Sequence, residues 1–170
     1  VLYMEKKFRY DMQTGVVKTD KGLVHGYEYD GVVVFKGIPY ARARRFHEPE
    51  PMEPWEGILE TVGAGYICPN MEGEMLANDL GGAHRIGVQN ENCQNLNVWT
   101  PACDDGKRPV MVWLHGGAFT MGSSLENVSY EGHSASKYGN IVFVSINHRL
   151  NILGYCDLSE FGEEYENSGN

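Results

Sequence analysis

Two runs of hydrophobic residues in the second half of the chain show no alternation with polar positions. They span Val110–Leu114 and Ile141–Ile146. A continuous apolar run predicts a strand that is buried on both faces, as in a sheet covered by helices. The two runs therefore predict interior strands of an α/β sheet.

The stretch between these runs predicts a short helix at Tyr130–Tyr138. Ser129 is expected to cap this helix, Lys137 lies in its last turn, and Gly139 would end it. A strand, a helix and a second strand form a crossover unit, and such a unit joins parallel strands. We therefore expect the two apolar strands to be parallel.

Short segments rich in β-branched and aromatic residues begin the chain. Gly15–Thr19 and Leu23–Tyr27 lie on either side of Asp20-Lys21-Gly22, which predicts an antiparallel hairpin. Val32–Phe35 follows the turn at Asp30-Gly31 and predicts a third strand.

The middle of the chain is rich in residues that interrupt regular structure. Four prolines between Gly37 and Gly57 predict that no central strand or helix forms there; they are Pro39, Pro49, Pro51 and Pro54. Residues 63–94 are rich in Gly and Asn and predict a loop with room for one short helix. Leu96–Trp99 predicts a short strand that ends at Thr100-Pro101.

The charge balance excludes some classes of partner. Acidic residues outnumber basic ones by 23 to 14, which gives a formal net charge of −9. A field of this sign repels phosphates, so we expect no nucleic acid and no anionic membrane surface as partner. No apolar run approaches the roughly 18 residues that a membrane span needs. The first ten residues lack a signal-peptide pattern, which favours the cytoplasm over secretion, although a chain that opens on Val1 leaves a removed leader open.

The cysteines indicate neither a disulfide scaffold nor a zinc site. The chain has four of them, widely spaced, at positions Cys68, Cys93, Cys103 and Cys156. They lack C-x-x-C pairing and matching histidines. We expect no metal and no cofactor.

The residues after the first apolar run carry the strongest candidate chemistry. Leu114 is followed at once by His115-Gly116-Gly117-Ala118-Phe119. Adjacent glycines allow backbone angles that other residues avoid, and they let a ligand approach the main chain. Successive N–H groups in such a loop form a concave anion site. Ester hydrolysis passes through a tetrahedral oxyanion that such donors stabilise, so we predict an oxyanion loop rather than a plain glycine turn.

Two rival motifs are weaker. Gly117–Ser124 has the glycine spacing of a phosphate-binding P-loop, but Ser123 stands where the lysine is required. The next apolar strand ends in Asn147 and supplies no magnesium-binding aspartate. Gly132–Ser136 falls one glycine short of a G-x-S-x-G nucleophile elbow and follows no buried strand, so Ser134 is expected to be an ordinary helix residue.

Several further motifs occur in order through almost the whole chain. They are Gly37–Ala41, Arg45-Phe46, Pro54–Gly57, Cys68-Pro69, Glu91–Cys93, Leu96–Pro101, Val110–Phe119, Asn147–Leu150 and Leu153-Gly154. Together they resemble the type-B carboxylesterase/lipase family, which includes p-nitrobenzyl-esterase-like enzymes, mammalian carboxylesterases and cholinesterases. The resemblance implies an α/β-hydrolase fold, with a mostly parallel central sheet and an N-terminal antiparallel hairpin.

The resemblance also implies roles for residues of the loop. Gly117 and Ala118 would donate N–H groups to the oxyanion, and Gly116 would shape the turn. The substrate pocket would include four neighbouring side chains, namely His115, Phe119, Thr120 and Met121. No metal or cofactor is implied.

Other matching positions imply structural roles. Cys68 and Cys93 match a disulfide pair that closes a surface loop in many members. Arg45 and Glu91 match a structural ion pair, and Arg149 is expected to be structural as well.

The chain also departs from the family pattern. Asn92 stands where Asp is common, Gln94 replaces Leu, His148 replaces the Tyr of an N-Y-R-L motif, and Asn151 replaces a small residue. These changes leave the oxyanion loop intact and bear on substrate range.

The family places its nucleophilic Ser, its acidic residue and its catalytic His downstream of these motifs. The chain contains no G-x-S-x-G. We therefore expect residues 1–170 to be the N-terminal, incomplete part of a single hydrolase domain and to be inactive alone. The expected activity is carboxylic-ester hydrolysis on a small-molecule ester, completed by the missing C-terminal part or a companion chain. The alternative is a catalytically inactive, esterase-like binding or adhesion module.

Overall fold

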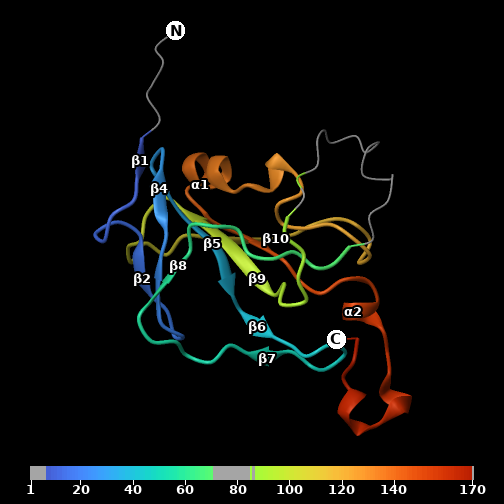
Figure 1. Cartoon of the computed structure of the whole chain (residues 1–170). Helices are drawn as coiled ribbons and strands as arrows, with labels where there is room; N and C mark the ends of the chain where they lie inside the picture. The colour runs from blue at the N-terminus through green and yellow to red at the C-terminus, as the bar shows by residue number, and fades with distance from the viewer. Residues whose placement is uncertain (1–6, 71–84, 86, 170) are drawn as a thin grey trace.

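The main sheet of the computed structural model contains six strands in the order β1-β4-β5-β9-β11-β10 (Figure 1). The structure describes residues 7–70, 85 and 87–169, and every count given below refers to those residues. The strands are β1 Phe8–Arg9, β4 Tyr27–Tyr29, β5 Val32–Pro39, β9 Asn95–Thr100, β10 Val110–Leu114 and β11 Val142–Ile146. The pairing of β10 with β11 is parallel, and the other four pairings are antiparallel. The sheet is therefore mixed in this part of the chain.

The predicted crossover unit joins β10 to β11 through helix α1 (His133–Gly139). The register runs from Val110 opposite Val142 to Leu114 opposite Ile146. The prediction for the helix start was wrong, because α1 begins at His133 after the N-cap Gly132. The preceding turn η2 (Val128–Tyr130) is a separate 3₁₀ segment.

The caps of these two segments also differ from the prediction. Asn127, rather than Ser129, accepts a hydrogen bond at the start of η2, from the N–H of Ser129. Helix α1 includes Gly139, and Asn140 ends it in a left-handed conformation with φ of 50°. Asn tolerates this conformation better than most residues, which explains why the stop falls one residue late.

The predicted N-terminal hairpin is present as β2 (Val16–Lys18) and β3 (Leu23–His25). It belongs to a second sheet, in which β8 (Ile58–Glu60) pairs in parallel with β3. The chain crosses from this sheet to the main one at Gly26, where a Cβ would lie 2.2 Å from the carbonyl oxygen of Val34. Val32–Phe35 is a strand, but it pairs with β4 and β9 rather than with the hairpin.

Strand β5 corrects the expectation that the proline-rich stretch holds no central strand. It continues through Gly37 to Pro39 and lies between β4 and β9. Its register shifts between Phe35 and Ile38, and Gly37 adopts a positive φ of 68° there. This bulge and the terminal position of Pro39 let the strand accept residues that a regular ladder would reject. Beyond it, β6 (Ala41–Arg42) and β7 (Glu50–Pro51) form only a two-stranded ribbon.

The core lies on the β4-β5-β9 side of the main sheet. Val32, Val34, Trp99 and Phe143 form one buried cluster against α1, and Val24, Val33 and Phe35 form another toward the second sheet. Trp99 and Phe143 meet edge to face, with ring centroids 5.9 Å apart. Both faces of β5 are therefore covered.

The two apolar runs are less buried than their composition predicts. All five residues of β10 are exposed, and in β11 only Phe143 and Ser145 are buried. Strand β10 is the edge strand, and the contacts of α1 go to β5, β9 and β11. The apolar run of β10 therefore predicts burial, but the described residues leave this strand exposed.

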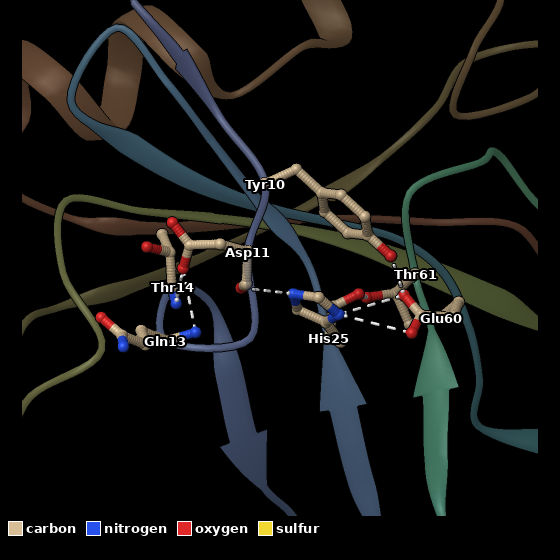
Figure 2. A network of polar contacts seen from close by, with 7 residues as sticks. All are labelled: Tyr10, Asp11, Gln13, Thr14, His25, Glu60 and Thr61. Atoms are coloured by element: carbon tan, nitrogen blue, oxygen red, sulfur yellow. Dashed lines mark hydrogen bonds and ion pairs between the residues drawn. The ribbon is translucent and has the colours of Figure 1, made fainter.

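The segment before β2 is attached to the second sheet by a polar network (Figure 2). The buried His25 ring points its Nε2 at the carbonyl oxygen of Asp11 (2.9 Å) and its Nδ1 at a carboxylate oxygen of Glu60 (3.2 Å). The Tyr10 hydroxyl donates to the same carboxylate at 2.6 Å, and its ring stacks on His25. These bonds satisfy a buried imidazole and hold the N-terminal segment in place.

The last elements are short. Helix α2 (Asn151–Tyr155) follows β11, and two 3₁₀ turns, η3 (Ser159–Phe161) and η4 (Glu163–Tyr165), extend away from the sheet in Figure 1. In the described part of residues 63–94 the structure has a bridge between Ile67 and Gln89, and the helix expected in this range is absent from that part. Residues 71–84 and 86, over which that expectation also extends, lie outside the described residues. No helix of the described chain is long and apolar enough to cross a membrane.

Candidate oxyanion site

The predicted oxyanion loop leaves the sheet at the carboxyl end of β10. Three consecutive residues have positive φ angles, namely Gly117 (118°), Ala118 (52°) and Phe119 (63°). A positive φ is uncommon for a residue with a side chain, and such angles gather at functional sites. A Cβ on Gly117 would lie 2.0 Å from the carbonyl oxygen of Met121, so this position requires glycine.

The loop is closed by its own carbonyl groups. The Gly117 oxygen accepts the N–H groups of Thr120 (3.0 Å) and Met121 (3.2 Å), and the Thr120 hydroxyl donates to the Ala118 oxygen at 3.0 Å. With these carbonyls turned inward, the N–H groups of Gly117 and Ala118 find no acceptor within the described chain. Both residues are exposed.

The segment after β11 is hydrogen-bonded to the loop. The N–H of Asn151 donates to the Phe119 oxygen at 2.7 Å, and Asn151 itself has a φ of 50°. The Asn151 side chain donates to the Pro69 oxygen at 2.8 Å. In the sequence Asn151 is visible only as a departure from the family pattern, and the one available signal is that Asn adopts a left-handed backbone more readily than most residues.

A buried network of polar side chains fixes the residues that follow the loop. Asn97 on β9 donates to the hydroxyls of Ser124 (3.0 Å) and Ser145 (3.2 Å). The Ser124 N–H donates to the Asn147 side chain at 2.8 Å, and Asn147 donates to Asn95 at 3.2 Å. Ser123 and Ser124 are buried and no α-helix follows them directly, which removes the P-loop alternative.

The four predicted pocket residues separate into two kinds. Phe119 and Thr120 are exposed, and the Phe119 ring lies 5.0 Å from the ring of Tyr155 in α2. His115 and Met121 are partly buried beneath the loop. Burial lowers the pKa of His115, helped by His148, whereas the hydrogen bond with Gly116 and the charge of Glu126 oppose this shift. Ser134 lies exposed on α1, as expected of an ordinary helix residue.

The remaining predicted residues lie apart from the loop. Arg45 forms an ion pair with Glu91, whose pKa is lowered by that hydrogen bond. Cys68 and Cys93 are buried free thiols in one cluster with Leu150, and the Leu150 N–H donates to the Cys68 sulfur at 3.1 Å. Arg149 is buried and donates to the His47 oxygen at 2.8 Å. No group of three His, Cys, Asp or Glu side chains suited to a metal occurs among the described residues.

The N–H groups of Gly117 and Ala118, which find no acceptor among the described residues, follow the parallel strand β10, where the sequence predicts an oxyanion site. Comparison with known proteins places the chain in a family. The carboxylesterase family model matches residues 13–170, and the chain belongs to that family, within which its fold is that of the α/β-hydrolases.

Individual relatives agree with the family assignment. The chain is 38% identical over 157 residues to a para-nitrobenzyl esterase of Bacillus subtilis (strain 168). This similarity covers 90% of the present chain and 31% of that protein. A solved esterase of Clostridium hathewayi is similar at 48% identity and a TM-score of 0.87, covering 98% of this chain and 33% of that one. A solved carboxylesterase of Geobacillus stearothermophilus is 39% identical in sequence, with a TM-score of 0.79. The similarity covers 92% of this chain and 31% of that one. The chain thus spans about a third of the length of these relatives.

Proposed function

We propose that this chain supplies the oxyanion loop of a carboxylic-ester hydrolase, and that residues 1–170 are the N-terminal part of its single hydrolase domain. The observation that carries the proposal is that the N–H groups of Gly117 and Ala118, two exposed residues, have no acceptor among the described residues. Attack on an ester turns its carbonyl oxygen into an oxyanion, and each fixed donor lowers that barrier by about 3 kcal/mol.

The other half of the chemistry is proposed to come from residues beyond this sequence. A serine nucleophile, a histidine base and an acidic partner would complete the reaction, and no G-x-S-x-G occurs among the 170 residues. Catalytic groups of parallel sheets gather at the carboxyl ends of the strands. Leu114 is such an end, and the loop begins one residue later.

The exposed edge of β10 supports the same proposal. Its five residues, VMVWL, are exposed in the described chain, and a strand edge of this kind pairs readily with another strand. We propose that a strand from the rest of the domain, or from a companion chain, adds here and brings the nucleophile beside the loop.

The substrate is proposed to be a small carboxylic ester whose acyl or alcohol group contacts the aromatic pair of Phe119 and Tyr155. The Clostridium hathewayi esterase can hydrolyze aliphatic aromatic polyesters, so a polyester oligomer is a sensible second substrate to test on the present protein.

The experiment uses the full-length protein that contains this chain. We expect it to hydrolyse p-nitrophenyl acetate and butyrate and to gain one adduct mass with a serine-reactive organophosphate. Intact-mass measurement of the purified protein also shows whether the triad arrives on the same chain or on a companion.

The competing function is a catalytically inactive binding module. It predicts neither hydrolysis nor a covalent adduct, and that pair of results would overturn the esterase proposal. The Gly117 and Ala118 donors favour the esterase, because a binding module has no need of an oxyanion site.

A further inference from the structure

Two histidine rings stack beneath the start of the loop. His115 directly follows β10 and His148 lies shortly after β11; their ring centroids are 5.0 Å apart and their planes differ by 13°. Each Nδ1 lies 2.8 Å from the carbonyl oxygen of the next residue, Gly116 or Arg149. A carbonyl oxygen only accepts, so Nδ1 carries the proton in both rings. The two rings are thus fixed by their own backbones and meet face to face.

The stack and Asn151 hold opposite ends of the loop. His115 directly precedes Gly116, and its ring fixes the Gly116 carbonyl. Asn151 fixes the Phe119 carbonyl at the other end. His148 and Asn151 lie three residues apart in the sequence, so one short segment supports both ends of the stretch that carries the two N–H groups.

The surroundings favour a neutral His115. Burial lowers its pKa below the ordinary value, and Glu126, from the segment after the loop, acts in the opposite direction. The other groups that face this cluster are His148 and the Tyr155 ring, which meets His148 edge to face at 6.4 Å. The Nε2 atom of His115 is buried and meets no partner among the described residues. A second proton on His115 would be buried without an acceptor, which disfavours the charged form of that ring.

We propose that His148 is a positioning residue for ester hydrolysis, whose ring, stacked on His115, holds the Gly117 and Ala118 N–H groups in line for the oxyanion. This inference rests on the proposed function, which it deepens. Stacking of the His148 ring face on His115 holds the loop in place, and the Nδ1 hydrogen bond of His148 only orients its ring.

Two variants of the full-length protein separate the ring from the hydrogen bond. His148→Phe keeps a flat ring and loses the Nδ1 donor, whereas His148→Asn keeps a donor near the Nδ1 position and loses the ring. An aromatic pair contributes about 0.5–1.5 kcal/mol beyond its burial, which is about a two- to tenfold effect on rate. We expect kcat of His148→Asn to fall by about that factor at an unchanged KM, while His148→Phe stays close to wild type.

A matched control exists at His47. Its ring stacks on Tyr165 at 5.1 Å, and its Nδ1 lies 3.0 Å from the Glu164 oxygen, away from the loop. His47→Asn should therefore remove a similar stack and leave kcat unchanged. A kcat loss equal to that of His148→Asn would mean general destabilisation and would overturn the proposal.

A second measurement works without activity. The N–H groups of Thr120 and Met121 are protected only while the loop keeps its closed form. Their hydrogen exchange should accelerate several-fold in His148→Asn and not in His148→Phe. Equal exchange or equal kcat in the two variants overturns the positioning role. A wild-type protein that hydrolyses no ester overturns the proposed function instead, and the exchange data still decide whether His148 positions the loop.

Discussion

The β5–β9 region and the β10 edge are both rich in apolar residues, yet they have opposite environments. Val32 and Val34 on β5 and Trp99 on β9 are buried between α1 and the rest of the chain. Val110 and Leu114 on β10 are more than 60% exposed. The comparison teaches that apolar strands on one side of this sheet form a buried core, while the equally apolar strand β10 on the other side is exposed within the described chain.

A substitution in the buried core should have the largest effect. Trp99→Ala removes a buried indole that packs on Phe143, and such a change costs about 3–5 kcal/mol. Denaturant unfolding of the full-length protein measures it. Tyr138→Ala on α1, where the ring is 82% exposed, is the matched control and should stay within about 0.5 kcal/mol of wild type. Similar losses for the two variants would mean that the core does not lie where the structure places it.

The loop at the end of the exposed strand should tolerate substitution poorly, and its role in the reaction can be tested at Gly117. Gly117→Ala places a Cβ against the Met121 carbonyl at a positive φ, so the two donors move. We expect kcat to fall about 10²–10³-fold, the effect of losing an oxyanion donor. Gly63→Ala, whose Cβ would meet nothing within 4 Å, is the control. An active Gly117→Ala enzyme would show that this loop does not serve the reaction.

A third prediction concerns a disulfide bond between the two buried cysteines and its effect on stability. Cys68 and Cys93 are in contact, and we expect them to form a disulfide under oxidising conditions while Cys103, which is exposed, stays alkylatable. Closing this loop stabilises by about 2–4 kcal/mol. Mass spectrometry after alkylation, with and without reductant, measures the pairing, and thermal unfolding of Cys93→Ser measures the stability. Two reactive thiols at these positions without reductant would contradict the pairing.

A charged substitution in the exposed strand β10 should have opposite effects in the short chain and in the full-length protein. Val112, in the middle of β10, is 55% exposed, so Val112→Lys should make residues 1–170 produced alone more soluble. In the full-length protein the same lysine should destabilise the fold, because the proposed neighbouring strand buries that site. Sedimentation of the short chain and unfolding of the long one measure the two effects. No loss of stability in the long protein would mean that β10 stays an open edge.

The smallest effect concerns His115. Burial lowers its pKa from 6.5, so protons bind the unfolded chain first as the pH falls. The contribution of this residue is therefore complete above about pH 6.5 and is lost as the pH falls through the lowered native value. The drop in Tm between pH 7.5 and 5.5 should be smaller in His115→Asn than in wild type. A larger drop would reverse the assigned direction.

The sequence predicted the features that depend on local pattern. The hairpin of β2 and β3 and the glycine loop after β10 follow from residues within a few positions of one another, and the parallel pair of β10 and β11 follows from the order strand, helix, strand. The strand β8 was missed, because Ile58–Glu60 is too short to show a pattern and is defined by its pairing with β3. The burial of β10 was predicted wrongly, because composition does not show that β10 is the edge strand of the described sheet.

Parts of the site also depended on tertiary structure. Nothing in the sequence places Asn151 behind Phe119 or His148 against His115, since each contact joins the ends of two strands. The direction of the Gly117 and Ala118 donors depends on three successive positive φ angles, of which only the one at glycine can be expected from residue type.

The most direct test of the central claim is a crystal structure of the full-length protein that carries a phosphonate adduct on its nucleophile. The adduct oxygen imitates the oxyanion. We predict that this oxygen lies about 2.7–3.1 Å from the backbone nitrogens of both Gly117 and Ala118. An adduct oxygen held by other donors, with these two N–H groups still unpaired, would contradict the account.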